Sequence, residues 1–246
     1  MKILVVGADG AVAGALIVAL AESGHEIVAT YSEEVAGENR GAVESKPGVT
    51  FVELDCADSS AVDAFAREYM GFDGAVYANM YFQMEDLGSF DVAQWNLSLA
   101  HNLTAPMQLF SGYPSLLNDG ASIAIVTSTE AFRGSFRAAA YAATKAAAHN
   151  LVMTLANNLG ARGIRANAVA PGWIGGVMDT DEVFKMSRGI TPLGRLGSPS
   201  EVADVIEFLL SPKAGFVSGS VITVDGGYTG VDTISKFEAE STPEGD

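Results

Sequence analysis

A tyrosine and a lysine four residues apart, Tyr141 and Lys145, are the residues of this chain best suited to acid–base chemistry. They lie in an alanine-rich segment, residues 138–159, that contains neither proline nor glycine and therefore predicts a long helix. Positions i and i+4 share one face of a helix, so both side chains point the same way. Ser128, at the end of an apolar run upstream, adds a hydroxyl that can donate a hydrogen bond.

These three groups together could reduce a carbonyl or oxidise an alcohol. A phenol with a pKa near 10 is a weak base at neutral pH, but an ammonium ~4 Å away favours the phenolate by about 1–4 kcal/mol. We therefore expect Lys145 to lower the pKa of Tyr141 by about one to three units. Tyr141 then exchanges a proton with the substrate oxygen, to which Ser128 donates a hydrogen bond. Because such Tyr–Lys pairs are common on ordinary helices, this interpretation depends on the other motifs.

The pattern of apolar residues predicts the elements that hold these side chains. Short apolar runs alternate with helical patterns, as in parallel strands that are buried on both faces. We therefore predict a doubly wound, Rossmann-like α/β fold with a seven-stranded, mostly parallel sheet and helices on both faces. The expected strands are 3–6, 27–31, 49–54, 74–78, 122–127, 166–170 and 221–224, and the expected helices are 13–23, 60–69, 92–117 with breaks near Pro106 and Pro114, 139–160 and 199–210.

A glycine-rich turn, GADGAVAG at residues 7–14, links the first predicted strand to the first helix. Glycines permit a tight turn and let backbone N–H groups at the helix N-terminus approach a pyrophosphate. A plain strand-to-helix turn also favours glycine, so a structural role is the alternative. The cofactor-binding residues predicted here are Gly7, Asp9, Gly10, Ala11 and Val12.

The end of the second predicted strand indicates which nicotinamide cofactor binds. Tyr31 and Ser32, which we assign to the cofactor site, are followed by Glu33 and Glu34. An acidic residue here suits a ribose hydroxyl, whereas a basic one would hold a 2′-phosphate. We therefore expect NAD(H) to be preferred over NADP(H), unless Arg40 or a more distant cation intervenes.

From residue 1 to about Tyr228 the chain resembles the short-chain dehydrogenase/reductase family. Tyr141 and Lys145 match the YxxxK pair of that family, Ser128 its catalytic serine and Asn102 its helix asparagine. The ordered matches continue with Asp55, Pro171-Gly172, the segments 192–199 and 201–203, and the stretch 224–228.

The resemblance implies a role for each matching residue. Tyr141 would be the acid/base, Ser128 would position the substrate oxygen, and Lys145 would tune Tyr141 and bind the nicotinamide ribose. Asn102 would support a water-linked proton path, although alone it reads as a polar residue in mid-helix. The resemblance also implies contacts with the adenosine half from Asp55, Cys56, Ala78 and Asn79, and with the nicotinamide from Pro171, Gly172 and Ile174.

The chain departs from the family pattern at three places. The usual TGxxxGxG turn is altered, with Ala11 and Ala13 where glycines are common. The sequence YANM, residues 77–80, stands where the family usually has NNAG, and Gly176 stands where a threonine is frequent. These changes predict weaker cofactor affinity. They also motivate an alternative function, a nucleotide-binding sensor or interaction protein.

Large apolar side chains are expected to form the substrate wall. Their abundance suggests an apolar or cyclic substrate, although each could instead fill the core. Arg133 and Arg137 could attract an anionic substrate group or could be ordinary solvated surface. The predicted wall residues are Met80, Tyr81, Phe132, Trp173 and Met178, with Phe82, Phe184 and Met186 beside them.

The composition restricts the other classes of function. The 246-residue chain is 48% hydrophobic with a formal net charge of −16, which suits a single large domain and works against nucleic acid or anionic membranes as partners. Cys56 has no second cysteine to pair with, and His25, His101 and His149 are too scattered for a metal site. Without a secretory segment or a membrane span, we expect a cytoplasmic protein.

We predict one NAD(P)-binding oxidoreductase domain over residues 1–234 and an acidic, mobile tail over 235–246. The expected reaction moves a hydride between nicotinamide and a secondary alcohol or ketone. A hydrolase is disfavoured because the chain has no GxSxG motif. Small residues along the Tyr141 helix would allow close packing between subunits, so we expect a homotetramer, with a homodimer second.

Overall fold

The fold is described from a computed structural model over residues 1–32, 46–86, 88–176 and 179–241. Within these residues seven parallel strands form one sheet in the order β3-β2-β1-β4-β5-β6-β7, which confirms the predicted doubly wound fold. The strands are β1 (Lys2–Val6), β2 (Glu26–Tyr31), β3 (Val49–Glu53), β4 (Phe72–Tyr77), β5 (Leu117–Val126), β6 (Arg165–Pro171) and β7 (Val221–Val224).

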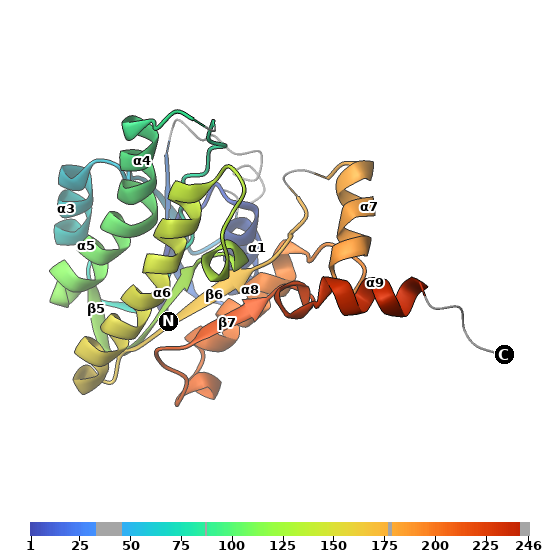
Figure 1. The fold of residues 1–246 in the computed structure, drawn as a ribbon. Coiled ribbons are helices and arrows are strands. Elements are labelled where there is room, and N and C mark those ends of the chain that lie inside the picture. The colour runs from blue at the N-terminus through green and yellow to red at the C-terminus, as the bar shows by residue number, and fades with distance from the viewer. Residues whose placement is uncertain (33–45, 87, 177–178, 242–246) are drawn as a thin grey trace.

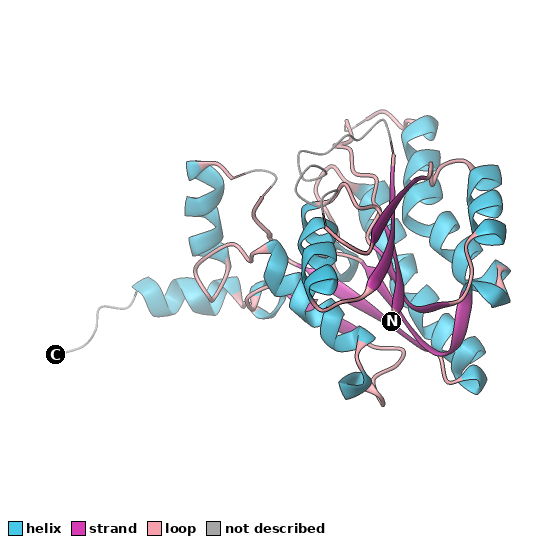
Figure 2. Ribbon diagram, turned by 180° about the vertical axis from the view of Figure 1, so that it is seen from behind, coloured by secondary structure: helices cyan, strands magenta, loops and turns pink. Residues whose placement is uncertain are grey.

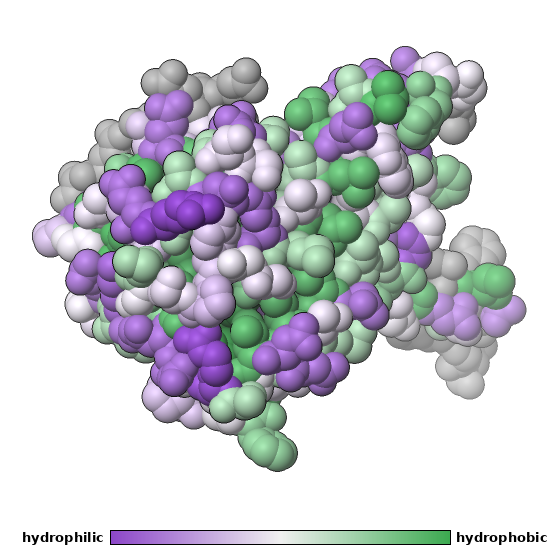
Figure 3. All heavy atoms as spheres, turned by 90° about the vertical axis from the view of Figure 1, so that its left-hand side faces the viewer, coloured by the Kyte–Doolittle hydropathy of each residue, from purple (hydrophilic) through white to green (hydrophobic). Residues whose placement is uncertain are grey.

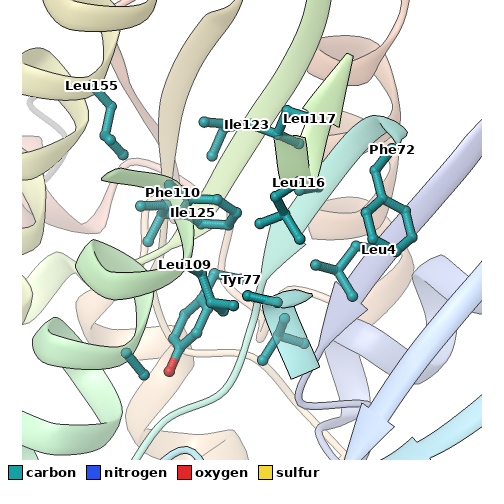
Figure 4. Packing of buried hydrophobic residues seen from close by; sticks show 14 of the residues in the cluster. Leu4, Phe72, Tyr77, Leu109, Phe110, Leu116, Leu117, Ile123, Ile125 and Leu155 are labelled. Carbon is teal, nitrogen blue, oxygen red and sulfur yellow. The ribbon is translucent and has the colours of Figure 1, made fainter. Parts of the chain in front are cut away.

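Helices cover both faces of the sheet (Figures 1 and 2). One face carries α1 (Ala11–Glu22) and α8 (Pro199–Leu210), and the other carries α3 (Ser59–Glu68), α4 (Val92–Leu99), α5 (Ala105–Gly112) and α6 (Ala139–Leu159). Each layer buries its own apolar cluster against the sheet because the strands are apolar on both faces. Figure 4 shows the α3–α6 side, where Tyr77 lies beside Leu109 and its hydroxyl points away from Leu4 and Phe72.

The predicted break near Pro106 has a clear structural form. Residues Ala100–Thr104 form a π-helical turn between α4 and α5. Pro106 has no N–H, so it cannot donate the α-helical hydrogen bond to the Asn102 carbonyl. The second break falls between the end of α5 at Gly112 and a 3₁₀ turn that begins at Pro114.

Within the described residues, two α-helices were not predicted from the sequence: α7 (Asp181–Ile190) and α9 (Thr233–Ser241). Both project from the sheet-containing body (Figure 1), and Lys236 of α9 donates a hydrogen bond to the Gly189 carbonyl of α7. The tail expected from residue 235 therefore starts inside a helix, and residues 242–246 lie outside the described part of the chain. Its mobility stays a prediction.

The surface at the left of Figure 1, where α3, α4 and α5 lie, mixes hydrophilic and hydrophobic patches (Figure 3). Exposed apolar side chains on α4, α5 and α6 include Leu97, Met107 and Met153. None of the described helices is both long enough and apolar enough to cross a membrane. The described residues also contain no group of three or more His, Cys, Asp or Glu that could hold a metal ion.

Candidate active site

The predicted site residues gather at the carboxyl ends of the parallel strands. Gly7 follows β1, Ser32 follows β2, Asn79 follows β4, Ser128 follows β5, and Pro171 ends β6. The strand order reverses between β1 and β4. In sheets of this topology, ligands bind in the crevice outside the strand ends at such a reversal.

The glycine turn leaves the N-terminus of α1 open to a phosphate. Gly10, the residue before α1, has no side chain to cap the helix, and the first turn of α1 holds no acidic residue. The helix dipole and the first N–H groups therefore favour an anion at Ala11 and Val12. Gly7 has a φ of +89°, and a Cβ there would lie 2.5 Å from the backbone of Asn79, so only glycine fits.

Asp9 connects this turn to the end of β2. Its Oδ2 accepts a hydrogen bond from the Ser32 backbone N–H at 3.1 Å. A carboxylate therefore lies at the position where the adenosine ribose is expected. The expected preference for NAD(H) was based on Glu33 and Glu34, and Arg40 was the residue that could oppose it; all three lie outside the described residues.

A buried polar cluster lies beneath the expected adenine site. Burial raises the pKa of the Cys56 thiol to about 11, so this cysteine is an inert thiol at neutral pH. Tyr77 donates to the His101 carbonyl at 2.5 Å, and Asn79 Nδ2 lies 3.1 Å from His101 Nδ1. Tyr77 and Asn79 belong to the segment that stands where the family usually has NNAG, and both contact His101. Exposed Asp55 accepts a hydrogen bond from the Ala57 N–H at 2.7 Å.

Tyr141 lies on the buried side of α6 with 9% of its surface exposed. A hydrogen bond with Ser128 lowers the pKa of Tyr141, but burial has the larger effect, so the pKa is raised above its usual value. Ser128 also accepts a hydrogen bond from the Glu130 N–H at 3.1 Å, which fixes its side chain. The structure therefore brings Ser128 and Tyr141 together as the sequence predicted.

Lys145 is one helical turn beyond Tyr141 and only 2% exposed. Its Nζ lies 5.6 Å from the centre of the Tyr141 ring and donates to the Val126 carbonyl at 3.0 Å. Burial lowers the pKa of Lys145 to about 7, because an ammonium loses its hydration in the protein interior. A partly neutral lysine gives the phenolate little support. The expected lowering of the Tyr141 pKa is therefore wrong for the protein without cofactor.

Asn102 lies in the π-helical turn and is 1% exposed. Its Oδ1 accepts from the Tyr81 N–H at 2.9 Å, while its Nδ2 donates to the Tyr81 carbonyl at 3.0 Å and to Thr144 Oγ1 at 3.1 Å. The side chain thus joins the segment after β4 to the helix that carries Tyr141 and Lys145. Thr144 was not predicted as a site residue, although it lies between the two members of the YxxxK pair.

The segment after β4 forms a wall against the phenol. Met80 Sδ lies 4.0 Å from Tyr141 Oη, and the Phe82 ring meets the Tyr141 ring edge-on at 5.2 Å. Met80 and Phe82 remain 57% and 48% exposed, so they face open space as well as Tyr141. Tyr81 differs: its ring stacks on His101 at 5.8 Å, and its hydroxyl donates to Gln83.

The other predicted wall residues are more dispersed. Phe132 packs against His149 at 4.8 Å between ring centres. Trp173 and Ile174 line a cavity of about 540 Å³ whose other walls come from residues 192–201 and 223–227, and not from Tyr141. Gly172 lies so close to Asp225 that a Cβ would meet its side chain at 2.6 Å. Met178 lies outside the described residues.

The two arginines considered for anion binding have partners within the protein. Arg133 donates to the Thr229 carbonyl at 3.1 Å and lies over the Tyr228 ring at 4.8 Å. Arg137 donates to the Glu85 carbonyl at 2.9 Å and pairs with Asp86 at 3.1 Å. No sequence motif marks Glu85, whose carboxylate accepts two hydrogen bonds at the start of α6.

Comparisons with known proteins identify relatives of this chain. A family model described as Enoyl-(Acyl carrier protein) reductase matches residues 7–229. The chain is 30% identical to galactitol 2-dehydrogenase (L-tagatose-forming) of Cereibacter sphaeroides, over 92% of this chain and 93% of that protein. It is 33% identical to cis-4-hydroxycyclohexanecarboxylate dehydrogenase of Sinomonas cyclohexanicum, over 93% and 96% of the two chains.

Solved structures are similar over nearly the whole chain. A short-chain dehydrogenase/reductase from Serratia marcescens BCRC 10948 has a TM-score of 0.83 and 26% identity, covering 93% of this chain and 97% of that one. A blue fluorescent protein from a metagenomic library, in complex with NADPH, has a TM-score of 0.83 and 25% identity, covering 92% and 97%.

Proposed function

Because this chain belongs to the short-chain dehydrogenase/reductase family, a family of oxidoreductases, we propose that it transfers a hydride between a nicotinamide cofactor and a secondary alcohol or ketone, with Tyr141 as the acid/base. One observation carries the proposal. Tyr141 is buried close enough to Ser128 for that hydroxyl to lower its pKa, and it lies one helical turn from Lys145, at the edge of the sheet where a dinucleotide is expected to bind.

In the reducing direction, Tyr141 gives its proton to the carbonyl oxygen as the hydride reaches the carbonyl carbon. Its raised pKa keeps the phenol protonated at neutral pH, which is the form that a proton donor requires. Ser128 donates a hydrogen bond to the same oxygen and stabilises the charge that develops there. The nicotinamide, when bound, supplies or accepts the hydride.

Two further residues support this proton transfer. Lys145 binds the nicotinamide ribose, and contact with ribose hydroxyls in place of apolar surroundings favours its charged form. In that form Lys145 helps Tyr141 to take a proton from an alcohol. Asn102 supports the proton path by holding the Tyr81 backbone and Thr144 in place beside the site.

The wall beside Tyr141 supports an apolar, cyclic substrate. Met80 and Phe82 place a thioether and a phenyl ring next to the phenol. Neither group forms strong hydrogen bonds with the hydroxyls of a sugar-like substrate. Arg133 and Arg137 are engaged elsewhere, so they give no reason to expect an anionic group. Of the two similar dehydrogenases, one is named for a cyclohexane substrate and the other for galactitol, so the apolar wall is what supports the cyclic class.

Asp9 supports NAD(H) as the preferred cofactor. Its carboxylate lies at the Ser32 N–H, where an acidic group suits the ribose hydroxyls of NAD(H). The structure with NADPH described above is that of the metagenomic protein, and it does not establish which cofactor this chain binds. For this chain, the cofactor is an NAD(H) bound by the turn at residues 7–12, the end of β2, and the segments at 55–56, 78–79 and 171–174.

A screen of alcohols and ketones with NAD(H) and NADP(H), following absorbance of the reduced cofactor, tests the proposal. We expect turnover of cyclic ketones with NADH. Cofactor binding without turnover of any carbonyl would overturn the proposal and favour the sensor alternative. Tenfold higher catalytic efficiency with NADPH would refute the argument from Asp9.

We also propose that the protein assembles as a homotetramer. The exposed apolar residues Leu97, Met107 and Met153 on α4, α5 and α6 support contacts between subunits. Light scattering of the active protein decides this, because a mass near 25.5 kDa would identify an active monomer.

A further inference from the structure

The helix that carries Tyr141 is capped by a residue from a distant segment. Ala138, the residue before α6, has no polar side chain, but Glu85 reaches this helix end instead. Its Oε1 accepts from the Ala140 N–H at 2.6 Å and its Oε2 from the Ala139 N–H at 2.9 Å. A carboxylate with two N–H donors at a helix N-terminus is a strong, charge-assisted arrangement.

Other helices of the structure are capped locally. Asp58, Asp91, Thr180 and Ser198 directly precede α3, α4, α7 and α8 and accept hydrogen bonds from their first turns. Such caps stabilise a helix without reaching another segment. Glu85 lies 54 residues before Ala139, so its cap also fixes the position of the segment after β4 relative to α6.

The backbone strengthens this attachment. The Glu85 N–H donates to the Arg137 carbonyl at 2.8 Å, and Arg137 Nε donates to the Glu85 carbonyl at 2.9 Å. Arg137 has a φ of +56°, a left-handed conformation that is uncommon for residues with a side chain. The segment after β4 is therefore joined to Arg137, just before the start of α6, through both the N–H and the carbonyl of Glu85.

The segment has a second attachment at Tyr81, where Asn102 bonds both backbone groups. The residues that touch Tyr141 lie next to this point and before Glu85: Met80 at 4.0 Å and Phe82 at 5.2 Å. Without an attachment at Glu85, Phe82 would be free to move away from the phenol. The carboxylate cap and the backbone bonds to Arg137 together remove that freedom.

We propose that Glu85 is a positioning residue that holds the Met80–Phe82 wall in register with Tyr141 and thereby sets the preference for bulky substrates. The inference rests on the proposed function. A bulky cyclic ketone is held against the phenol by this wall, whereas a small ketone makes little contact with it. Misplacement by about 1 Å at a reacting centre can reduce the rate about 10²-fold.

The test compares Glu85→Ala with the parent enzyme on 2-decalone and acetone, each with NADH. We expect kcat/KM for 2-decalone to fall at least about 10-fold more than for acetone, with the dissociation constant for NADH unchanged. Glu85→Gln keeps one acceptor oxygen and should restore part of the preference. Equal losses for the two ketones would overturn the proposal.

Asp91→Ala is the matched control. Asp91 accepts from two N–H groups at the start of α4, Ala93 at 2.8 Å and Gln94 at 3.3 Å, but it does not cap the helix of Tyr141. This variant should lose a similar amount of thermal stability and retain the preference for 2-decalone. A matching loss of preference in Asp91→Ala would show that a weakened fold, rather than the position of the wall, is responsible.

Hydrogen–deuterium exchange tests the same claim without turnover. In Glu85→Ala, peptides covering 80–86 and 139–141 should both exchange at least about 10-fold faster, whereas in Asp91→Ala both should match the parent. If the parent reduces neither ketone, the expected substrate class is wrong, and exchange alone decides the role of Glu85. Unchanged exchange at residues 80–82 in Glu85→Ala would refute that role.

Discussion

Replacing Lys145 with methionine should stabilise the cofactor-free protein while it destroys activity. Lys145 is almost fully buried, and burial lowers its pKa from 10.5 to about 7. The unfolded chain therefore holds a proton that the folded chain binds poorly. Folding is opposed by the free energy of removing that proton or of burying the charge. Methionine fills a similar volume without a charge.

The pKa shift sets the size of the effect. Below pH 7 the full shift, about 3.5 units, opposes folding by about 5 kcal/mol. The hydrogen bond from Nζ to the Val126 carbonyl, worth about 1 kcal/mol, is lost in the variant. We expect Lys145→Met to gain about 2–4 kcal/mol at pH 7, which raises Tm by roughly 4–16 °C for a chain of this size.

The sign of the pH dependence is also fixed. The folded-state pKa lies below the unfolded-state value, so the penalty is complete below about pH 7 and disappears as pH rises toward 10.5. Urea unfolding of both proteins between pH 6.5 and 10 measures the difference at each pH. We expect that difference to shrink steadily with pH. A Lys145→Met protein that is less stable than the parent at pH 7 would refute this reasoning.

Two further substitutions test the site. Gly7→Ala should weaken NADH binding at least about 10-fold and cost about 1–3 kcal/mol of stability, because its Cβ would lie 2.5 Å from Asn79 at a φ of +89°. Gly10→Ala is the control. Its Cβ would meet only the Gly7 carbonyl at 3.7 Å, so this variant should keep the parent's Tm. Calorimetric titration and thermal unfolding check both, and equal Tm values for the two variants would disprove the steric argument. Asn102→Ala leaves the Tyr81 N–H and carbonyl without their partner, so we expect a loss of about 2–4 kcal/mol and at least about 10-fold slower turnover. Parent-like unfolding and kinetics would show that Asn102 does not hold this segment.

The sheet and its helices could be predicted because their apolar residues recur at the spacing of buried strands and helices. All seven strands lie where the apolar runs indicated, and α8 has the predicted bounds. Helix α7 was missed because it buries little: only Ser187 of its ten residues is fully buried. The sequence features that favour helix α7 are local: Thr180 caps its N-terminus, and two acidic residues lie in its first turn. The helix contributes no apolar side chain to the core.

Features of the site that depend on distant segments could not be predicted. The side chains of Ser128, Tyr141 and Lys145 follow a spacing that the sequence displays, but their pKa values depend on burial, which the sequence does not give. The cap by Glu85 and the bonds from Asn102 to Tyr81 join residues 21 or more positions apart with no local motif. Only the folded arrangement reveals them.

The turnover of Tyr141→Phe tests the central claim most directly. Phenylalanine keeps the edge-on packing against Phe82 but removes the transferable proton. With a ketone that the parent reduces, we predict turnover at least about 10²-fold lower, with the dissociation constant for NADH unchanged. Turnover within a few-fold of the parent would contradict the assignment of Tyr141 as the acid/base.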